Sequence, residues 1–212
     1  MTPTMKFIDI HTHNKAEETA HTIFNSNGEP SDRPVSAGIH PWDVDNNWEE
    51  RFRTIKEFAK TPNVVAIGEC GIDRVHQGAA PELQAEVFRA HIALSEELGK
   101  PLMIHCVKAF DIIIALYKEY KPRQAWIIHG FRGKLQQAGQ LTRAGLHLSL
   151  GEHFNKESAK FIPAEKLFIE SDESNVPIKD IYAAVAAARG CSIEELACLV
   201  SANAERCRIR LI

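Results

Sequence analysis

The sequence contains no C-x-x-C cysteine pair, no run of 18 apolar residues and no excess of basic residues. Its five cysteines are scattered and odd in number, which argues against a zinc ribbon or a disulfide framework and indicates a reducing compartment. The chain has no candidate membrane-spanning helix, and no basic segment followed by an apolar run at its start. The formal net charge of −3 gives no global basic field for nucleic acid. We therefore expect a soluble, cytoplasmic protein with no membrane partner.

The composition is that of an ordinary globular protein, with 44% hydrophobic and 25% charged residues. A chain of 212 residues is long enough for one good-sized core and short for two. No linker or low-complexity segment divides it. We therefore expect residues 1–212 to form a single domain.

Short apolar runs alternate along the chain with segments that have helical periodicity. Such alternation predicts repeated strand–helix units around a parallel sheet. Strands are expected at 7–13, 22–24, 35–39, 64–68, 101–104, 125–128, 146–150 and 167–169. Helices are expected at about 48–60, 81–98, 110–117, 132–143, 178–189 and 193–207. The fold class is α/β, and a closed, distorted TIM-like (β/α) barrel fits better than an open sheet because of where the polar residues fall.

Five of the apolar runs end in side chains that can bind a metal: His11 with His13, Glu69, His105, His129 and Asp172. Taken singly, each has a common structural explanation, such as a hydrogen-bonded histidine at a strand end, a partner for a helix N-terminus, or an aspartate that caps a loop. In a parallel barrel, however, the carboxyl ends of all strands share one rim, where such folds place their chemistry. The joint pattern therefore favours a metal site.

Four histidines and two carboxylates form a mixed set of nitrogen and oxygen ligands. Such a set suits zinc, manganese or iron. Magnesium fits less naturally because it prefers oxygen ligands. The residues alone leave the identity of the metal open.

The sequence also resembles the TatD-type metal-dependent hydrolases, the TatD deoxyribonuclease family within the amidohydrolase-like superfamily. The resemblance rests on an ordered set of segments spread over nearly the whole chain. They are DIHTH at 9–13, GIHP at 38–41, IGECGID at 67–73, PLMIH at 101–105, HGFRG at 129–133, IESD at 169–172 and Asn203. Each segment is weak alone, but the ordered set is specific.

This resemblance implies a distorted TIM barrel that holds two divalent ions, for which zinc, manganese and magnesium are the candidates. It places His11, His13 and Asp172 at one ion and His105 with His129 at the other, and Glu69 bridges the two. It also implies hydrolysis of phosphodiesters, as in a deoxyribonuclease, and therefore a nucleic-acid substrate such as the ends of single-stranded DNA.

A mechanistic hypothesis follows from this implied site. Two ions about 3.5–4 Å apart lower the pKa of a shared water towards about 7. Asp172 would position this water and accept its proton, and Glu69 would serve as the second catalytic carboxylate.

Four basic residues follow strand ends and are candidate phosphate contacts: Arg74, Lys108, Arg132 and Lys134. Ordinary solvated charge is the alternative explanation for each. Trp42 and Phe131 are candidates for stacking on a base, with packing in the core or at the rim as the alternative.

The chain departs from the family pattern at the substrate side, being shorter than typical members. Only 26 residues separate His13 from His40, so one N-terminal βα unit is expected to be curtailed. The loop after Asp172 lacks the family's proline and arginine pattern. Two alternatives to a nuclease remain open: a hydrolase of small amides, lactones or phosphoesters on the same binuclear site, and a non-catalytic barrel with a vestigial site. The oligomeric state is also open, and a monomer is compatible with the sequence.

Overall fold

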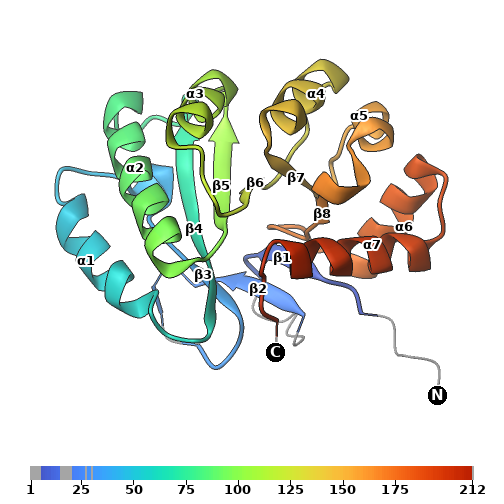
Figure 1. The fold of residues 1–212 in the computed structure, drawn as a ribbon, viewed down its shortest axis with the longest axis horizontal. Coiled ribbons are helices and arrows are strands. Elements are labelled where there is room, and N and C mark those ends of the chain that lie inside the picture. The colour runs from blue at the N-terminus through green and yellow to red at the C-terminus, as the bar shows by residue number, and fades with distance from the viewer. Residues whose placement is uncertain (1–5, 15–20, 27, 30, 212) are drawn as a thin grey trace.

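Eight parallel strands form one sheet in which the spatial order, β1 to β8, follows the order of the chain (Figure 1). The computed structural model describes residues 6–14, 21–26, 28–29 and 31–211. The strands are β1 (Asp9–Thr12), β2 (Thr22–Asn25), β3 (Val35–Ala37), β4 (Val64–Asp73), β5 (Leu102–Val107), β6 (Trp126–Ile128), β7 (His147–Leu150) and β8 (Leu167–Ile169). The expected parallel arrangement is confirmed.

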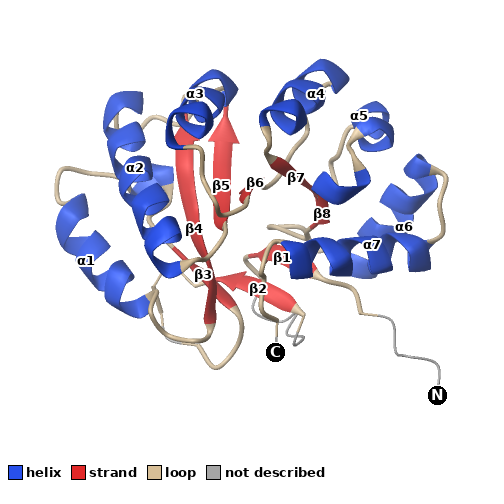
Figure 2. Ribbon diagram, viewed as in Figure 1, coloured by secondary structure: helices blue, strands red, loops and turns tan. Residues whose placement is uncertain are grey.

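The helices lie outside the strands and form an arc around them, as the blue elements of Figure 2 show. They are α1 (Trp48–Phe58), α2 (Pro81–Leu98), α3 (Phe110–Tyr120), α4 (Leu135–Ala144), α5 (Lys156–Phe161), α6 (Ile178–Arg189) and α7 (Ile193–Arg206). Two short 3-10 helices, η1 (Pro41–Asp43) and η2 (Ala164–Lys166), complete the set in the described residues. The sequence did not predict α5, which has only six residues and no clear apolar stripe.

The barrel closes where β1 meets the end of β8, through an isolated parallel bridge between Thr12 and Asp172. Asp172 donates its backbone N–H to the carbonyl of His11 at 2.9 Å, and its carbonyl accepts from His13 N at 2.9 Å. The closing hydrogen bonds therefore involve three of the residues that the sequence marks as metal ligands. The TIM-like barrel expected from the sequence is confirmed.

The first two strand connections are short. Residues 13–21 link β1 to β2 and residues 26–34 link β2 to β3, and none of the described residues in either link is helical. Among the described residues, the outer layer of helices begins at α1, which follows β3, and ends at α7 (Figure 1). The short links on either side of β2 agree with the curtailment expected near the N-terminus.

The strands β4 and β5 run further than their apolar runs predicted, to Asp73 and Val107. β4 continues past Glu69 to Asp73, and its later part pairs with β5 in the register Gly71 to His105. The register shifts between Ile67 and Cys70, so Glu69 lies at an irregularity inside the strand. The prediction that Glu69 follows the strand end was wrong, because the sheet pairing continues through polar residues that the apolar pattern cannot mark.

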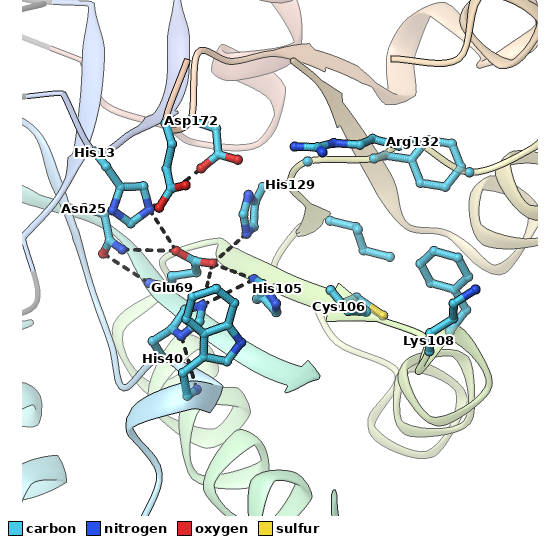
Figure 3. A pocket seen from close by; sticks show the side chains of 18 of the residues that line it. His13, Asn25, His40, Glu69, His105, Cys106, Lys108, His129, Arg132 and Asp172 are labelled. Carbon is cyan, nitrogen blue, oxygen red and sulfur yellow. Dashed lines mark hydrogen bonds and ion pairs between the residues drawn. The ribbon is translucent and has the colours of Figure 1, made fainter. Parts of the chain in front are cut away.

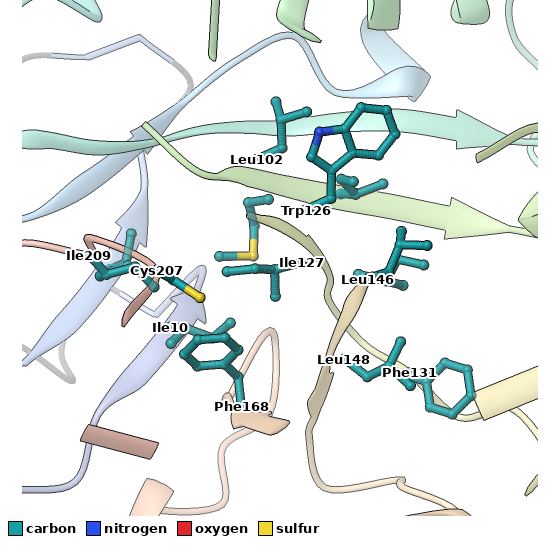
Figure 4. Close-up of a cluster of buried hydrophobic side chains, with 14 of the residues drawn as sticks. Ile10, Leu102, Trp126, Ile127, Phe131, Leu146, Leu148, Phe168, Cys207 and Ile209 are labelled. Carbon is teal, nitrogen blue, oxygen red and sulfur yellow. The ribbon is translucent and has the colours of Figure 1, made fainter. Parts of the chain in front are cut away.

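Apolar side chains from the strands and the inner faces of the helices form one continuous buried cluster. Figure 4 shows part of it, with side chains that include Ile10, Ile127, Leu148 and Phe168 from β1, β6, β7 and β8. Burial of a large aliphatic or aromatic side chain contributes roughly 1.5–3 kcal/mol, so this cluster is what holds the strand ends in place. No helix in the described part of the chain is both long enough and apolar enough to cross a membrane.

A buried histidine of α2 holds the segment after β3. His91 is completely buried, accepts a hydrogen bond from Ile39 N at 3.0 Å and contacts the carbonyl of Val87 through Nδ1 at 2.8 Å. This pairing requires neutral imidazole with its proton on Nδ1. Burial lowers the pKa of His91 to about 4.

We predict that His91 makes the protein less stable in acid. Between its unfolded pKa of 6.5 and its folded pKa of about 4, the unfolded chain binds more protons, so stability falls as the pH falls through this window. Between about pH 7 and about pH 5 this amounts to about 2 kcal/mol. The loss of unfolding free energy over that range, measured by urea denaturation, should be smaller by about this amount in His91→Gln. His153→Gln, at an exposed histidine, is the matched control, and an unchanged slope in His91→Gln would contradict the assignment.

Candidate metal centre

The carboxylate of Glu69 lies at the centre of a cluster of nitrogen atoms at the carboxyl end of the barrel. Glu69 is 3% exposed, and the atoms around it come from β1, β2, β5 and the segments after β1, β3 and β6. Six nitrogen atoms lie within 3.3 Å of its two oxygens. The cluster divides into two groups, one at each oxygen.

The first group surrounds Oε1. His129 Nε2 lies 2.7 Å from this oxygen, His105 Nδ1 lies at 2.8 Å and His40 Nε2 at 3.0 Å. His129 directly follows β6, and His105 lies inside β5. This group brings together two predicted ligands and adds His40, which the sequence analysis did not assign to the site.

The second group surrounds Oε2. Asn25 Nδ2 lies 3.1 Å from this oxygen, His13 Nε2 at 3.2 Å and His11 Nε2 at 3.3 Å. Asp172 completes the group, since its Oδ1 lies 3.7 Å from His11 Nε2 and 3.8 Å from His13 Nε2. All six residues that the sequence marks as ligands therefore meet in one place.

The cluster has the properties of a site for cations. A carboxylate offers about four lone-pair positions, fewer than the six nitrogen atoms that face it. Both ring nitrogens of His11 are buried without a hydrogen-bond partner, and so is Nδ1 of His129. Neutral imidazole nitrogens with free lone pairs, together with carboxylate oxygens, are the donors that divalent transition metals prefer. The residues present therefore fit divalent ions on both sides of Glu69.

The ionisation of the cluster agrees with this fit. Burial alone would raise the pKa of Glu69, but the imidazoles of His129 and His11 outweigh it and hold that pKa well below its usual range. Burial likewise disfavours charge on His129, yet the adjacent Glu69 raises its pKa to about 10. Burial and the charge on His129 lower the pKa of His11 to about 4. The buried carboxylate thus demands positive charge, which a bound cation supplies.

Asp73, at the end of β4, fixes the orientation of His105. Its Oδ2 lies 3.1 Å from Nε2 of His105, so the ring donates there and turns the lone pair of Nδ1 towards Glu69. Burial would raise the pKa of Asp73, but hydrogen bonds from Trp42, His76 and other donors lower it to about 2. A carboxylate that orients a ligand histidine in this way is a recurrent feature of metal sites.

His40 joins the predicted ligands at Oε1 of Glu69. Its Nδ1 accepts a hydrogen bond from the backbone N–H of Trp42 at 3.2 Å, which orients the ring. Its Nε2 lies 3.0 Å from Oε1 of Glu69 and 3.3 Å from Nδ1 of His105. His40, Glu69 and His105 therefore form a group that could hold a metal ion.

The cluster opens into a cavity of about 810 Å³. Lys108, Arg132 and Lys134 line it, and none of their charged groups is engaged in an ion pair within the described residues. In Figure 3, Glu69 lies at one end of the view and Lys108 and Arg132 lie towards the other. A second hollow of about 340 Å³ adjoins the first and shares Arg132 and Asp172 with it.

Arg74 does not join the other predicted phosphate contacts. Its Nη1 lies 3.2 Å from Oδ1 of Asp111 and donates to the carbonyl of Lys108 at 3.3 Å, on the exposed surface. It is not among the residues that line either hollow. The sequence places Arg74 just after a predicted strand end, but β4 extends to Asp73 and carries Arg74 away from the cluster.

The residues that hold the ligands in place were not predicted from the sequence. Asn25 ends the short strand β2, Asp73 ends β4, and the buried Glu170 accepts a hydrogen bond from Gly130 N beside His129. Asn25 follows an apolar run and thus carries the same signal as the ligands themselves. Glu170 also carries this signal, because it directly follows the apolar run at 167–169. No comparable signal marks Asp73, which acts through His105, a partner distant in sequence.

The sequence matches one family model and several curated proteins. The model of the family described as "TatD related DNase" matches residues 5–208. A "3'-5' ssDNA/RNA exonuclease TatD" of Erwinia tasmaniensis is 30% identical over 198 residues, covering 81% of this chain and 76% of the relative. An "uncharacterized metal-dependent hydrolase YabD" of Bacillus subtilis is 31% identical over 193 residues, with the same shares covered.

Solved structures agree with the fold. A hydrolase of the TatD family from Entamoeba histolytica superposes with a TM-score of 0.76 at 18% identity, covering 96% of this chain and 98% of that one. The TatD homologue YjjV of Escherichia coli gives a TM-score of 0.71 at 20% identity, covering 82% of this chain and 77% of that one. At these identities the likeness concerns the fold alone.

We predict that Zn²⁺ or Mn²⁺ binds this cluster and stabilises the protein. A ligand at 100 times its dissociation constant adds about 2.7 kcal/mol, which for a chain of this size raises Tm by about 5–10 °C. Glu69→Gln removes the central charge and should abolish both the shift and the metal retained after dialysis, measured by calorimetry and elemental analysis.

Glu173→Gln is the matched control for this experiment. Glu173 is exposed and lines the same cavity, but the structure gives it no contact with the imidazoles, so this variant should bind metal as the wild type does. Equal metal binding by Glu69→Gln and the wild type would show that Glu69 is not at the centre of the site.

Proposed function

The chain belongs to the TatD-related DNase family, and from this premise we propose that it is an exonuclease that removes nucleotides from the ends of single-stranded nucleic acid. The broader statement, a metal-dependent hydrolase acting on phosphoester bonds, follows from the family and from its named relatives. One observation carries the proposal: the buried Glu69 carboxylate is common to two groups of side chains that could hold a metal ion, one with His11 and His13 and one with His40 and His105. Such a shared carboxylate is what a pair of ions requires.

We assign His11, His13 and Asp172 to one ion and His105 with His129 to the other, with Glu69 between them. When bound, two divalent ions lower the pKa of a water molecule and neutralise charge on a phosphodiester oxygen. Zinc, manganese and magnesium differ in the ligand atoms that they prefer. The four imidazoles favour zinc or manganese.

The side chains of this protein supply the remaining functions. Asp172 lines both hollows and its side chain is 22% exposed, so it can hold the attacking water and accept its proton. Asp73 and His40 keep His105 and Glu69 in place during the reaction. Hydrolysis on this site requires no serine or cysteine nucleophile.

Lys108, Arg132 and Lys134 are the groups we assign to the substrate phosphates. Each lines the larger cavity, and a guanidinium or ammonium there attracts the backbone of a single strand without reading its sequence. Arg132 also lines the adjoining hollow, so it can contact the phosphates on either side of the cleaved bond.

The volume of the cavity supports a second candidate function. About 810 Å³ lies within the range of roughly 300–1,000 Å³ that is usual for small-molecule sites, so a small phosphoester, amide or lactone would also fit. The free cations on the wall favour the polyanionic substrate. A vestigial site is disfavoured because all six ligand side chains converge with their partners in place.

We expect the wild type to shorten a 5'-labelled single-stranded oligonucleotide stepwise in Mn²⁺ or Zn²⁺, as seen on a denaturing gel. Asp172→Asn and Glu69→Gln should lower the rate by about 100-fold or more, because each removes a group that the reaction uses. Glu173→Gln should retain activity. Cleavage that persists in EDTA, or that both variants leave intact, would contradict the proposal, and turnover of a small diester without any oligonucleotide cleavage would favour the second candidate.

The two arginines provide a separate test of the phosphate contacts. Arg132→Ala should weaken binding of single-stranded DNA and reduce the slope of log K against log salt by about 0.7, the value for one lost phosphate contact. Arg74→Ala is the matched control, since Arg74 lies outside the cavity and pairs with Asp111. Equal salt slopes for the two variants would remove Arg132 from the binding site. Binding would be measured by fluorescence anisotropy at several salt concentrations.

A further inference from the structure

Trp42 is the large aromatic side chain of the cavity wall that stays open to solvent. It is 48% exposed, whereas Trp126 is 1% exposed and Phe131, the other candidate for stacking, is 2% exposed. Phe131 packs against Phe110 at a centroid distance of 6.1 Å. A single exposed aromatic is common on protein surfaces, so its meaning depends on how it is held and on what it faces.

The indole of Trp42 is held rigidly. Its Nε1 donates to Oδ2 of Asp73 at 2.8 Å, and its backbone N–H donates to Nδ1 of His40. The ring of His76 stacks on it, with centroids 4.6 Å apart and planes inclined by 16°. The backbone N–H of His76 is in turn fixed by Asp73 at 3.0 Å. An aromatic ring fixed in this way binds a ligand at little cost in side-chain entropy.

The position of Trp42 links the cavity wall to the metal cluster. Its ring centroid lies 4.8 Å from that of His40 and 5.9 Å from that of His105, and both of these histidines contact Glu69. A base resting on Trp42 would therefore lie beside the cluster where the phosphodiester is proposed to bind. The cations Lys108 and Arg132 line the same cavity and are available to the next phosphates.

From this arrangement we propose that Trp42 is a stacking platform for the base of the nucleotide whose phosphodiester is cleaved. This inference rests on the proposed nuclease function and adds a specificity residue to it. A base can stack on the indole only when its own face is free, so the platform selects unpaired nucleotides over a continuous duplex. Because every base has a π face, the selection does not depend on sequence.

The test compares binding of a single-stranded oligonucleotide with binding of an abasic oligonucleotide of the same length, both in EDTA to prevent cleavage. Loss of a base–aromatic stack weakens binding roughly five- to 150-fold. Trp42→Leu should lose this factor for the normal strand and change binding of the abasic strand by less than about two-fold. The indole fluorescence of the wild type should be quenched by the normal strand only.

Two further variants make the result specific. Trp42→Phe keeps an aromatic face but lacks the N–H that binds Asp73, and it should retain most of the discrimination between the two strands. Trp48→Phe is the matched control, because Trp48 packs against Phe52 at 5.9 Å and does not line the cavity. It should behave as the wild type in binding and in quenching.

The outcomes separate this inference from the proposed function. If Trp42→Leu keeps the wild-type ratio between normal and abasic strands while both still bind, the platform is overturned and the nuclease proposal stands. Equal loss of discrimination in Trp42→Phe and Trp42→Leu would also overturn it, since the N–H and not the ring face would then be responsible. If the wild type binds neither strand in EDTA but shortens the oligonucleotide in Mn²⁺, the platform is overturned and the nuclease proposal stands. If it neither binds nor cleaves the oligonucleotide, both proposals fail.

Discussion

The burial of one carboxylate constrains the rest of this structure. Glu69 lies in the interior of the barrel rim, where an isolated negative charge would cost several kcal/mol. It is tolerated because nitrogen atoms from five neighbouring strands or their ends face it, among them Asn25, His40 and His129. Each of these strands must therefore end at the correct height. The register of the parallel sheet must therefore bring these nitrogen atoms to the Glu69 carboxylate for its charge to be stabilised.

Residues of the proposed metal site also make the hydrogen bonds that close the barrel. The backbone of Asp172, in the segment after β8, is hydrogen-bonded to His11 and His13 at the end of β1. Asp9 adds to this seam by accepting from Ser171 N at 3.0 Å. The backbone that closes the fold thus presents three of the proposed ligands. Because strands pack rigidly, ligands carried on them keep their mutual positions more closely than loop residues would.

The sequence predicted the parts of this structure that depend on local pattern. Apolar runs marked the strands, helical periodicity marked six of the helices, and polar residues after the runs marked the ligands. It did not predict the continuation of β4 to Asp73 or the pairing of Arg74 with Asp111. Those features depend on the register between strands that are distant in sequence, which a periodicity cannot reveal. Partner residues such as Asp73 escaped for the same reason.

The proposed metal ligands and the proposed substrate contacts differ in where they lie on the barrel. Three of the six proposed metal ligands lie in strands, whereas Trp42, Lys108 and Arg132 all lie in the segments that follow β3, β5 and β6. Loop segments tolerate replacement better than the strands on which they are mounted. Among the described residues, most of the cavity wall comes from the segments after β3, β5 and β6. Under the proposed function, substrate range is set by these three segments, and it can change without moving the carboxylate on which the barrel depends.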